Sequence, residues 1–220
     1  MNNLIETENV FEIREQLDSQ VFDWCKTTAY HNRVQANENE DTWHIVEDQM
    51  YIPDHILDRI NDWLSSINFP NLQYAVLFQK RNLNETRNQS LHIDYNEEYD
   101  EPSKACVNIA IENFDKTFLH YWKGSYDLQK RYSNDTVDMF VDEYSEENHI
   151  PYLHLEWNDQ PVVSDTYPVT EKVHVCKIDI PHSVTAFEDY RVMLSLRLDK
   201  NPSLQQLKEY YYQGIEHNAS

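Results

Sequence analysis

The chain has 220 residues, a formal net charge of −21, and 40% hydrophobic and 13% aromatic residues. This length and composition predict a packed globule with a sizeable core. The negative charge disfavours nucleic acid as a partner, because most of this surface would repel a phosphate backbone.

Glycine and cysteine usage excludes several classes of protein. The sequence has only two glycines, Gly124 and Gly214, so it has no glycine-rich phosphate loop and no nucleophile elbow. Cys25, Cys106 and Cys176 lack the paired spacing of a zinc site or a disulfide framework, which favours free thiols in a reducing compartment. The pattern contains no signal peptide and no membrane span, so we expect a cytoplasmic protein.

Residues 1–69 are predicted to be a helical N-terminal support. Apolar residues first recur at steps of three and four at Val10, Ile13, Leu17, Val21 and Trp24. That spacing predicts an amphipathic helix. The stretch PDHILDRINDWLSSI predicts a second helix, because Pro53 suits the first helical turn and the apolar residues after it line one face.

Residues 70–198 are predicted to form the β core of a single domain that spans 1–220. Short apolar runs separated by Asn, Asp, Pro and Glu are typical of an all-β sandwich or barrel. The runs are Tyr74–Gln79, Ser90–Tyr95, Cys106–Ile111, Thr117–Trp122, Pro161–Val163, Val173–Ile178, His182–Phe187 and Tyr190–Leu198. Polar residues 123–160 are predicted to be an insertion that covers one mouth, and 202–217 a C-terminal helix.

The candidate chemistry centres on His92, Asp94 and His182. In an extended strand, residues two apart face the same way, so His92 and Asp94 can both reach one metal ion. His182 follows a proline and begins an apolar run, which makes it a candidate third ligand. Two histidines and one carboxylate form the facial triad of non-haem iron(II) oxygenases.

A two-residue turn at Glu188–Asp189 would pair residues 182–187 with 190–198. Ser195 would then lie opposite His182, and Arg191 and Arg197 would share its face. Arg191 would be about 13 Å from His182 along the ladder. Such a space suits a small dicarboxylate that chelates a metal at one end and meets guanidinium at the other.

The ordered motifs "HID", "VNIAIEN", "FLHYW" and "DIPHSVTAFEDYRVMLSLRL" resemble those of 2-oxoglutarate/iron(II)-dependent oxygenase-like proteins. They are most similar to a branch found in marine phages and bacteria. The likeness covers about residues 70–198. The chain departs from the pattern at Ala110, where relatives often have proline, and in its long 123–160 insertion.

The resemblance implies a mainly β fold with flanking helices, a double-stranded β-helix of the jelly-roll, cupin-like type. It implies Fe(II) bound by His92, Asp94 and His182, and 2-oxoglutarate held by Arg191, which opens the final strand as in the family. Arg197 competes for that role because it is also in phase. Further expected contacts to the cosubstrate are Ser195, Asn108 and Tyr74.

The implied function is a hydroxylase that uses O2 on a small-molecule or side-chain substrate. The alternative is a cupin-like metal-binding or structural module without turnover, which the family's phage links extend to a virion-associated protein. A calcium loop starting at Asp94 is excluded, because Tyr99 stands where glycine is needed and Ala105 where the bidentate glutamate belongs. The sequence leaves the substrate and the oligomeric state open.

Overall fold

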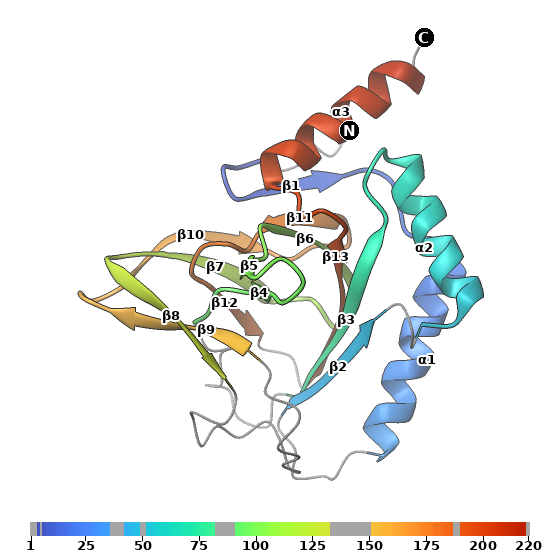
Figure 1. The fold of residues 1–220 in the computed structure, drawn as a ribbon. Coiled ribbons are helices and arrows are strands. Elements are labelled where there is room, and N and C mark those ends of the chain that lie inside the picture. Colours follow the sequence, from blue (N-terminus) through green and yellow to red (C-terminus); the bar gives the residue numbers. More distant parts are fainter. Residues whose placement is uncertain are drawn as a thin grey trace.

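The computed structural model describes residues 4, 6–35, 42–48, 52–81, 91–132, 151–186 and 190–218. In this part of the chain, antiparallel sheets pack with helices outside them (Figure 1). The helices are α1 (Ser19–Gln35), α2 (Asp54–Ser66) and α3 (Leu204–Asn218). The strands are β1 (Val10–Ile13), β2 (Thr42–Asp48), β3 (Leu72–Arg81), β4 (Tyr95–Asn96), β5 (Glu101–Pro102), β6 (Ala105–Glu112), β7 (Thr117–Lys123), β8 (Tyr126–Tyr132), β9 (Pro151–Trp157), β10 (Val162–Pro168), β11 (Val173–Lys177), β12 (His182–Ala186) and β13 (Tyr190–Leu198).

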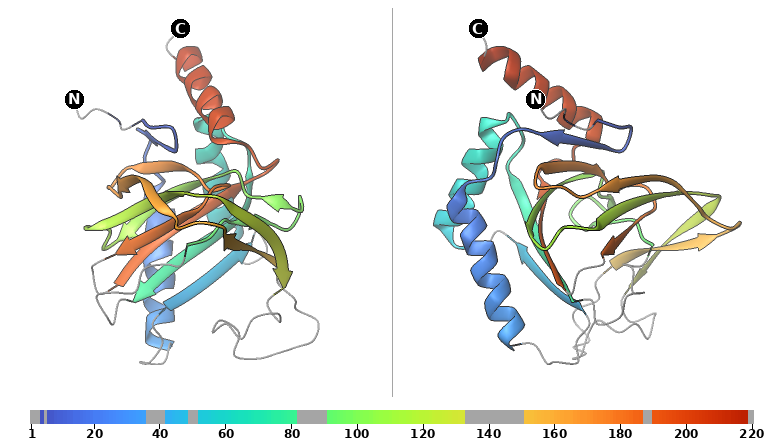
Figure 2. Two further views of the ribbon diagram at one scale, coloured as in Figure 1. Left: turned by 90° about the vertical axis from the view of Figure 1, so that its left-hand side faces the viewer. Right: turned by 180° about the vertical axis from the view of Figure 1, so that it is seen from behind.

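The larger sheet has the strand order β1-β11-β6-β13-β3-β2. Alternation along β13 sends Val192, Leu194 and Leu196 into the main hydrophobic core, which also contains buried residues of α1 and α2. Figures 1 and 2 show these two helices flanking the β2–β3 side of the sheet, with α3 beside β1. The opposite face of β13 carries Arg191 and Met193, which line a pocket with residues of β7 and β12.

The smaller sheet has the order β10-β7-β12, and a bridge between His92 and His182 adds a short fourth segment to it. From β3 onward, the chain passes repeatedly between the two sheets: β3, β6, β11 and β13 lie in the larger sheet, and residue 92, β7, β10 and β12 in the smaller. This winding is a double-stranded β-helix. The prediction of a mainly β, cupin-like jelly roll with flanking helices is confirmed.

The prediction of one helix from Val10 to Trp24 is wrong at its start. Val10–Ile13 form β1, which pairs with β11, and α1 begins only at Ser19. All four β1 residues are buried, because the strand is covered on both faces. The strand therefore lacks the alternation that would have marked it in the sequence.

The prediction for the second helix is confirmed. Pro53 stands at the N-cap of α2, and Ile56, Ile60, Trp63 and Leu64 are buried on one face. Burying each of these large apolar side chains contributes about 2 kcal/mol. The predicted C-terminal helix corresponds to α3.

The predicted hairpin between residues 182–187 and 190–198 is wrong. β12 pairs with β7 in the smaller sheet, whereas β13 pairs with β3 and β6 in the larger one. Ser195 consequently lies opposite Val76 and Asn108, not His182. The turn at Glu188–Asp189 falls outside the described residues.

The predicted insertion, residues 123–160, contains β8 and β9, which pair with each other as a separate two-stranded sheet. Ile93 bridges to Leu153 of β9, so this sheet joins the segment that carries His92. Residues 133–150 lie outside the described residues.

Candidate metal centre

Three candidate metal ligands meet where residues 92–94 run alongside the start of β12. The His92 N–H donates to the His182 carbonyl and the His182 N–H to that of His92, each at 3.0 Å. One ligand atom from each of His92, Asp94 and His182 lies within 4.8 Å of the others. His92 Nε2 is 3.3 Å from Asp94 Oδ1. Ligands bound at about 2.1 Å and at right angles lie roughly 3 Å apart, so the cluster has the dimensions of a metal site.

His182 is held in an orientation that suits ligation. Its Nδ1 lies 2.9 Å from the Ile180 carbonyl oxygen. A carbonyl can only accept, so Nδ1 carries the proton and Nε2 keeps its lone pair for a metal. Burial, reinforced by the neighbouring His92, lowers the pKa of His182 to about 4. The ring is therefore neutral at neutral pH, as a ligand must be.

Asp94 divides its two oxygens between two partners. Oδ1 faces His92, and Oδ2 accepts a 2.5 Å hydrogen bond from Nη2 of the buried Arg197. Arg197 Nη1 donates to Ser195 Oγ, which donates in turn to Asn108 Oδ1, each at 2.5 Å. A continuous polar chain thus runs from the interior of the larger sheet to the candidate ligand. It holds one carboxylate oxygen toward the histidines.

Arg191 lies in a different environment from Arg197. It is 4% exposed, and among the described residues its Nε and Nη1 have no hydrogen-bond partner. Burial lowers its pKa to about 10, so the guanidinium is still cationic at neutral pH. It lines a pocket of about 20 Å³ together with Asn108, His174 and Cys176. A buried cation with unsatisfied donors is costly, which points to an anionic ligand.

The structure brings most of the predicted site residues to the interior between the sheets. Arg191, Ser195 and Arg197 share one face of β13, as the alternation predicts. Asn108 faces the same interior from β6 and lines the Arg191 pocket. Tyr74 stands opposite Arg197 in the β3–β13 register and is half-buried.

Three residues of this interior were missed from the sequence. His174, Cys176 and Tyr167 line the Arg191 pocket from β11 and β10. The signal was present in "KVHVCKI", where the alternation of strand β11 puts His174 and Cys176 on one face.

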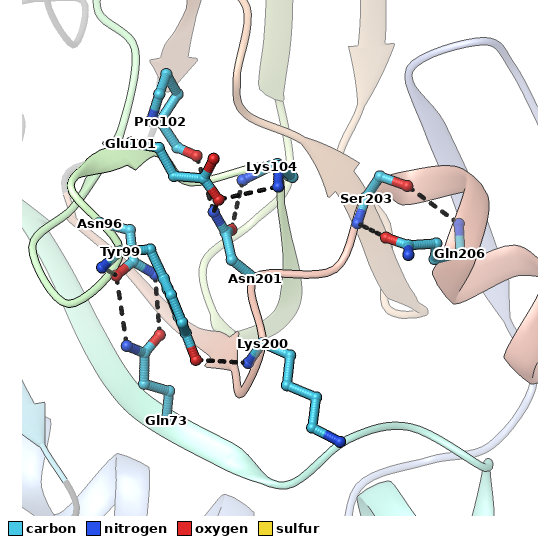
Figure 3. A network of polar contacts seen from close by, with 10 residues as sticks. All are labelled: Gln73, Asn96, Tyr99, Glu101, Pro102, Lys104, Lys200, Asn201, Ser203 and Gln206. Atoms are coloured by element: carbon cyan, nitrogen blue, oxygen red, sulfur yellow. Dashed lines mark hydrogen bonds and ion pairs between the residues drawn. The ribbon is translucent and has the colours of Figure 1, made fainter.

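The loop that follows Asp94 is tied to the end of β13 (Figure 3). Asn201, at φ 45°, accepts from the Lys104 N–H at 2.8 Å and donates to Glu101 Oε1 at 2.9 Å. The Lys200 N–H donates to Tyr99 Oη at 2.9 Å. Asparagine tolerates a positive φ better than most residues, which suits it to this turn. The anchored loop fixes the backbone downstream of the candidate ligands His92 and Asp94.

Among the described residues, no helix has the length and apolar character needed to cross a membrane. No family model and no curated protein matches the chain.

Solved structures match over most of the chain at low identity. HygX from Streptomyces hygroscopicus, solved with nickel and 2-oxoglutarate bound, is 11% identical over 86% of this chain and 81% of its own, with a TM-score of 0.44. AviO1 from Streptomyces viridochromogenes Tue57 is 12% identical over 88% and 91%, with a TM-score of 0.46. A Pseudomonas putida prolyl-4-hydroxylase is 11% identical over 87% and 94%, with a TM-score of 0.39. At these identities and TM-scores the likeness carries no argument about activity, and the site is defined by this chain's own residues.

Proposed function

We propose that this protein is a non-haem Fe(II)/2-oxoglutarate-dependent oxygenase that uses O2 to hydroxylate a small-molecule or side-chain substrate. The observation that carries the proposal is Arg191. It is a buried cation with unpartnered donors on the same face of β13 as Arg197, which contacts Asp94 of the His92–Asp94–His182 cluster. A metal-binding module alone has no need for such a cation.

The donor set fits iron(II). Two neutral imidazoles and one carboxylate leave coordination positions open for a chelating acid and for oxygen. Arg197 keeps Asp94 ionised and oriented, because it holds Oδ2 and leaves Oδ1 toward the histidines. When bound, iron and 2-oxoglutarate would supply the activation of dioxygen, and the protein supplies position and shielding.

Arg191 is the better anchor for the distal carboxylate of 2-oxoglutarate. The guanidinium of Arg197 already binds Asp94 and Ser195 and has only Nε without a partner among the described residues, whereas Arg191 has both Nε and Nη1 without one. The Arg191 pocket, at about 20 Å³, is of the order of one bound water. It therefore matches one terminal group of a ligand and not a complete substrate. Asn108 lines this pocket and is a further proposed contact.

The remaining candidates have supporting roles in this proposal. Ser195 hydrogen-bonds to Arg197 and Asn108, so it would influence the binding of 2-oxoglutarate through these two residues. Tyr74 lies opposite Arg197 in the register of β3 and β13, and we propose it as a further contact to 2-oxoglutarate.

The test is an anaerobic titration of iron(II) with and without 2-oxoglutarate, followed by the weak visible charge-transfer band of the chelate. We expect the band in the wild type and its loss in His182→Ala. Arg191→Met should still bind iron but need far more 2-oxoglutarate. Arg59→Ala is the matched control, because Arg59 pairs with Asp18 on the surface and should behave as wild type.

Iron binding without the band in the wild type would contradict the oxygenase proposal and favour a binding module without turnover. If Arg197→Met still binds iron but loses the band while Arg191→Met keeps it, the anchor for 2-oxoglutarate is Arg197 and the protein is still an oxygenase. Succinate formation in air would then report turnover.

A further inference from the structure

Two cysteine thiols lie side by side on the inner face of the larger sheet. Cys106 on β6 and Cys176 on β11 are directly opposite each other in the antiparallel register, and both thiols contact the side chain of Asn108. Directly opposed residues have Cα atoms about 4.5–5.5 Å apart. Disulfides span Cα separations of about 4.4–6.8 Å, so directly opposed cysteines lie within the range that a disulfide can bridge.

Both thiols lie in a small hydrophobic cluster but, unlike the third cysteine, they have a polar partner. Cys106 Sγ donates to Asn108 Oδ1 at 3.4 Å, and Asn108 Nδ2 donates to Cys176 Sγ at 3.7 Å. Cys176 also lines the Arg191 pocket, whose volume admits a water-sized molecule. Cys25 is buried among apolar side chains of the main core, where burial raises its thiol pKa.

We propose that Cys106 and Cys176 are a redox-active dithiol that hydrogen peroxide oxidises to a cross-strand disulfide. Peroxide is small enough to enter the pocket that Cys176 lines. The thiolate of one cysteine attacks one peroxide oxygen: an S–O bond forms, the O–O bond breaks, and the leaving hydroxide takes a proton to become water. The other cysteine then attacks the sulfenic sulfur, an S–S bond forms, and the second oxygen leaves as water. Two thiols lose two electrons and two protons, and one peroxide is reduced to two waters.

Oxidation changes the polar chain that reaches the candidate metal ligand. It removes the S–H donor to Asn108, and Asn108 is the acceptor for Ser195, which contacts Arg197. This consequence rests on the proposed function, whereas disulfide formation does not. We expect the Kd for 2-oxoglutarate to rise roughly tenfold, the cost of one hydrogen bond near a charged group.

The first test treats the metal-free full-length protein with hydrogen peroxide under native conditions. Intact mass should fall by two hydrogen atoms, and the count of thiols alkylated after denaturation should fall from three to one. Dithiothreitol should reverse both. Cys25→Ser should still form the bridge, and Cys106→Ser should not. Circular dichroism of Cys106→Ser checks that the variant is folded.

Three alkylated thiols after treatment, products that only gain oxygen, or a disulfide between two chains would overturn the dithiol. In the second test, 2-oxoglutarate binding to the iron-loaded reduced and oxidised forms is compared. Equal affinity of the two forms for 2-oxoglutarate would overturn the proposed effect of the disulfide on 2-oxoglutarate binding, while leaving the oxygenase proposal intact. Absence of binding in the reduced form would contradict the oxygenase proposal and, with it, the coupling, but not the disulfide.

Discussion

Buried Arg197 and half-buried Asp94 form an ion pair, 2.5 Å from Nη2 to Oδ2, that connects the last core strand to the loop after His92. Burial would raise the pKa of Asp94, but the Arg197 charge outweighs it and holds that pKa well below its usual range. The same pairing raises the pKa of Arg197 against the effect of burial. Asp94 therefore stays ionised without a metal, and its other oxygen, Oδ1, is already oriented toward His92.

Replacing Arg197 with methionine should destabilise the metal-free protein by about 3–5 kcal/mol, because it leaves the Asp94 carboxylate partly buried without its cation. Urea unfolding measures this loss. Asp94→Asn combined with Arg197→Met should cost less than the sum of the single changes, since both remove one interaction. Additive losses would show that the pair does not act as a unit.

Arg191 should behave in the opposite way. Its Nε and Nη1 have no hydrogen-bond partner within the described residues. Arg191→Met therefore removes a desolvated cation without breaking a hydrogen bond made by either nitrogen. We expect metal-free stability to stay equal or to increase by about 1–2 kcal/mol. Thermal unfolding of metal-free Arg191→Met and Arg197→Met measures this expected difference in stability. A loss as large as that of Arg197→Met would mean that Arg191 is structural.

Much of this site could be predicted from local sequence. Extended backbone puts residues two apart on one face, which is why His92 and Asp94, and likewise Arg191, Ser195 and Arg197, were grouped correctly. The jelly roll was also predicted, because its strands in the core are short apolar runs with clear punctuation.

The pairing of the strands could not be predicted in the same way. Residues 182–186 and 190–198 are neighbours in sequence, and the hairpin is the shortest connection between them. The structure sends them to different sheets, because each completes its own hydrogen bonds with a distant strand, β7 or β3 and β6. The preference of Arg197 for Asp94 depends on that long-range packing. No spacing along the chain reveals it.

His174 should make stability depend on pH. Burial lowers its pKa to about 4 and outweighs the attraction of Glu12. The unfolded chain, with an ordinary histidine pKa near 6.5, binds the proton more readily. The His174 contribution is thus complete above about pH 6.5 and is lost as pH falls toward 4. It amounts to about 3 kcal/mol over that window.

The measurement is urea unfolding at pH 7 and pH 4.5 for the wild type and His174→Gln. His182 titrates in the same window and is present in both proteins, so the difference between them isolates His174. The variant should lose less stability on acidification than the wild type does. His55→Gln, an exposed change on α2, controls for removing any histidine. Equal losses in all three proteins would contradict the assignment.

Glu12 should make the strongest polar interactions between β1 and the rest of the barrel. Its side chain is fully buried, and its carboxylate accepts from Tyr167 Oη at 2.7 Å, Thr170 Oγ1 at 3.0 Å and Lys172 Nζ at 3.0 Å. Glu12→Gln should cost about 3 kcal/mol, because it removes the charge while its donors stay in place.

Tyr167→Phe removes one of the bonds to Glu12 and should cost about 1–2 kcal/mol. In the Glu12→Gln background the same change should cost less, because the charge-assisted bond is already weakened. Urea unfolding of the four proteins gives this coupling. Hydrogen exchange of the β1 amides should accelerate in Glu12→Gln, since these amides pair with β11 only while β1 stays docked. Unchanged hydrogen exchange of the β1 amides together with a large loss of global stability would mean that Glu12 does not hold β1 in place but stabilises another part of the sheet.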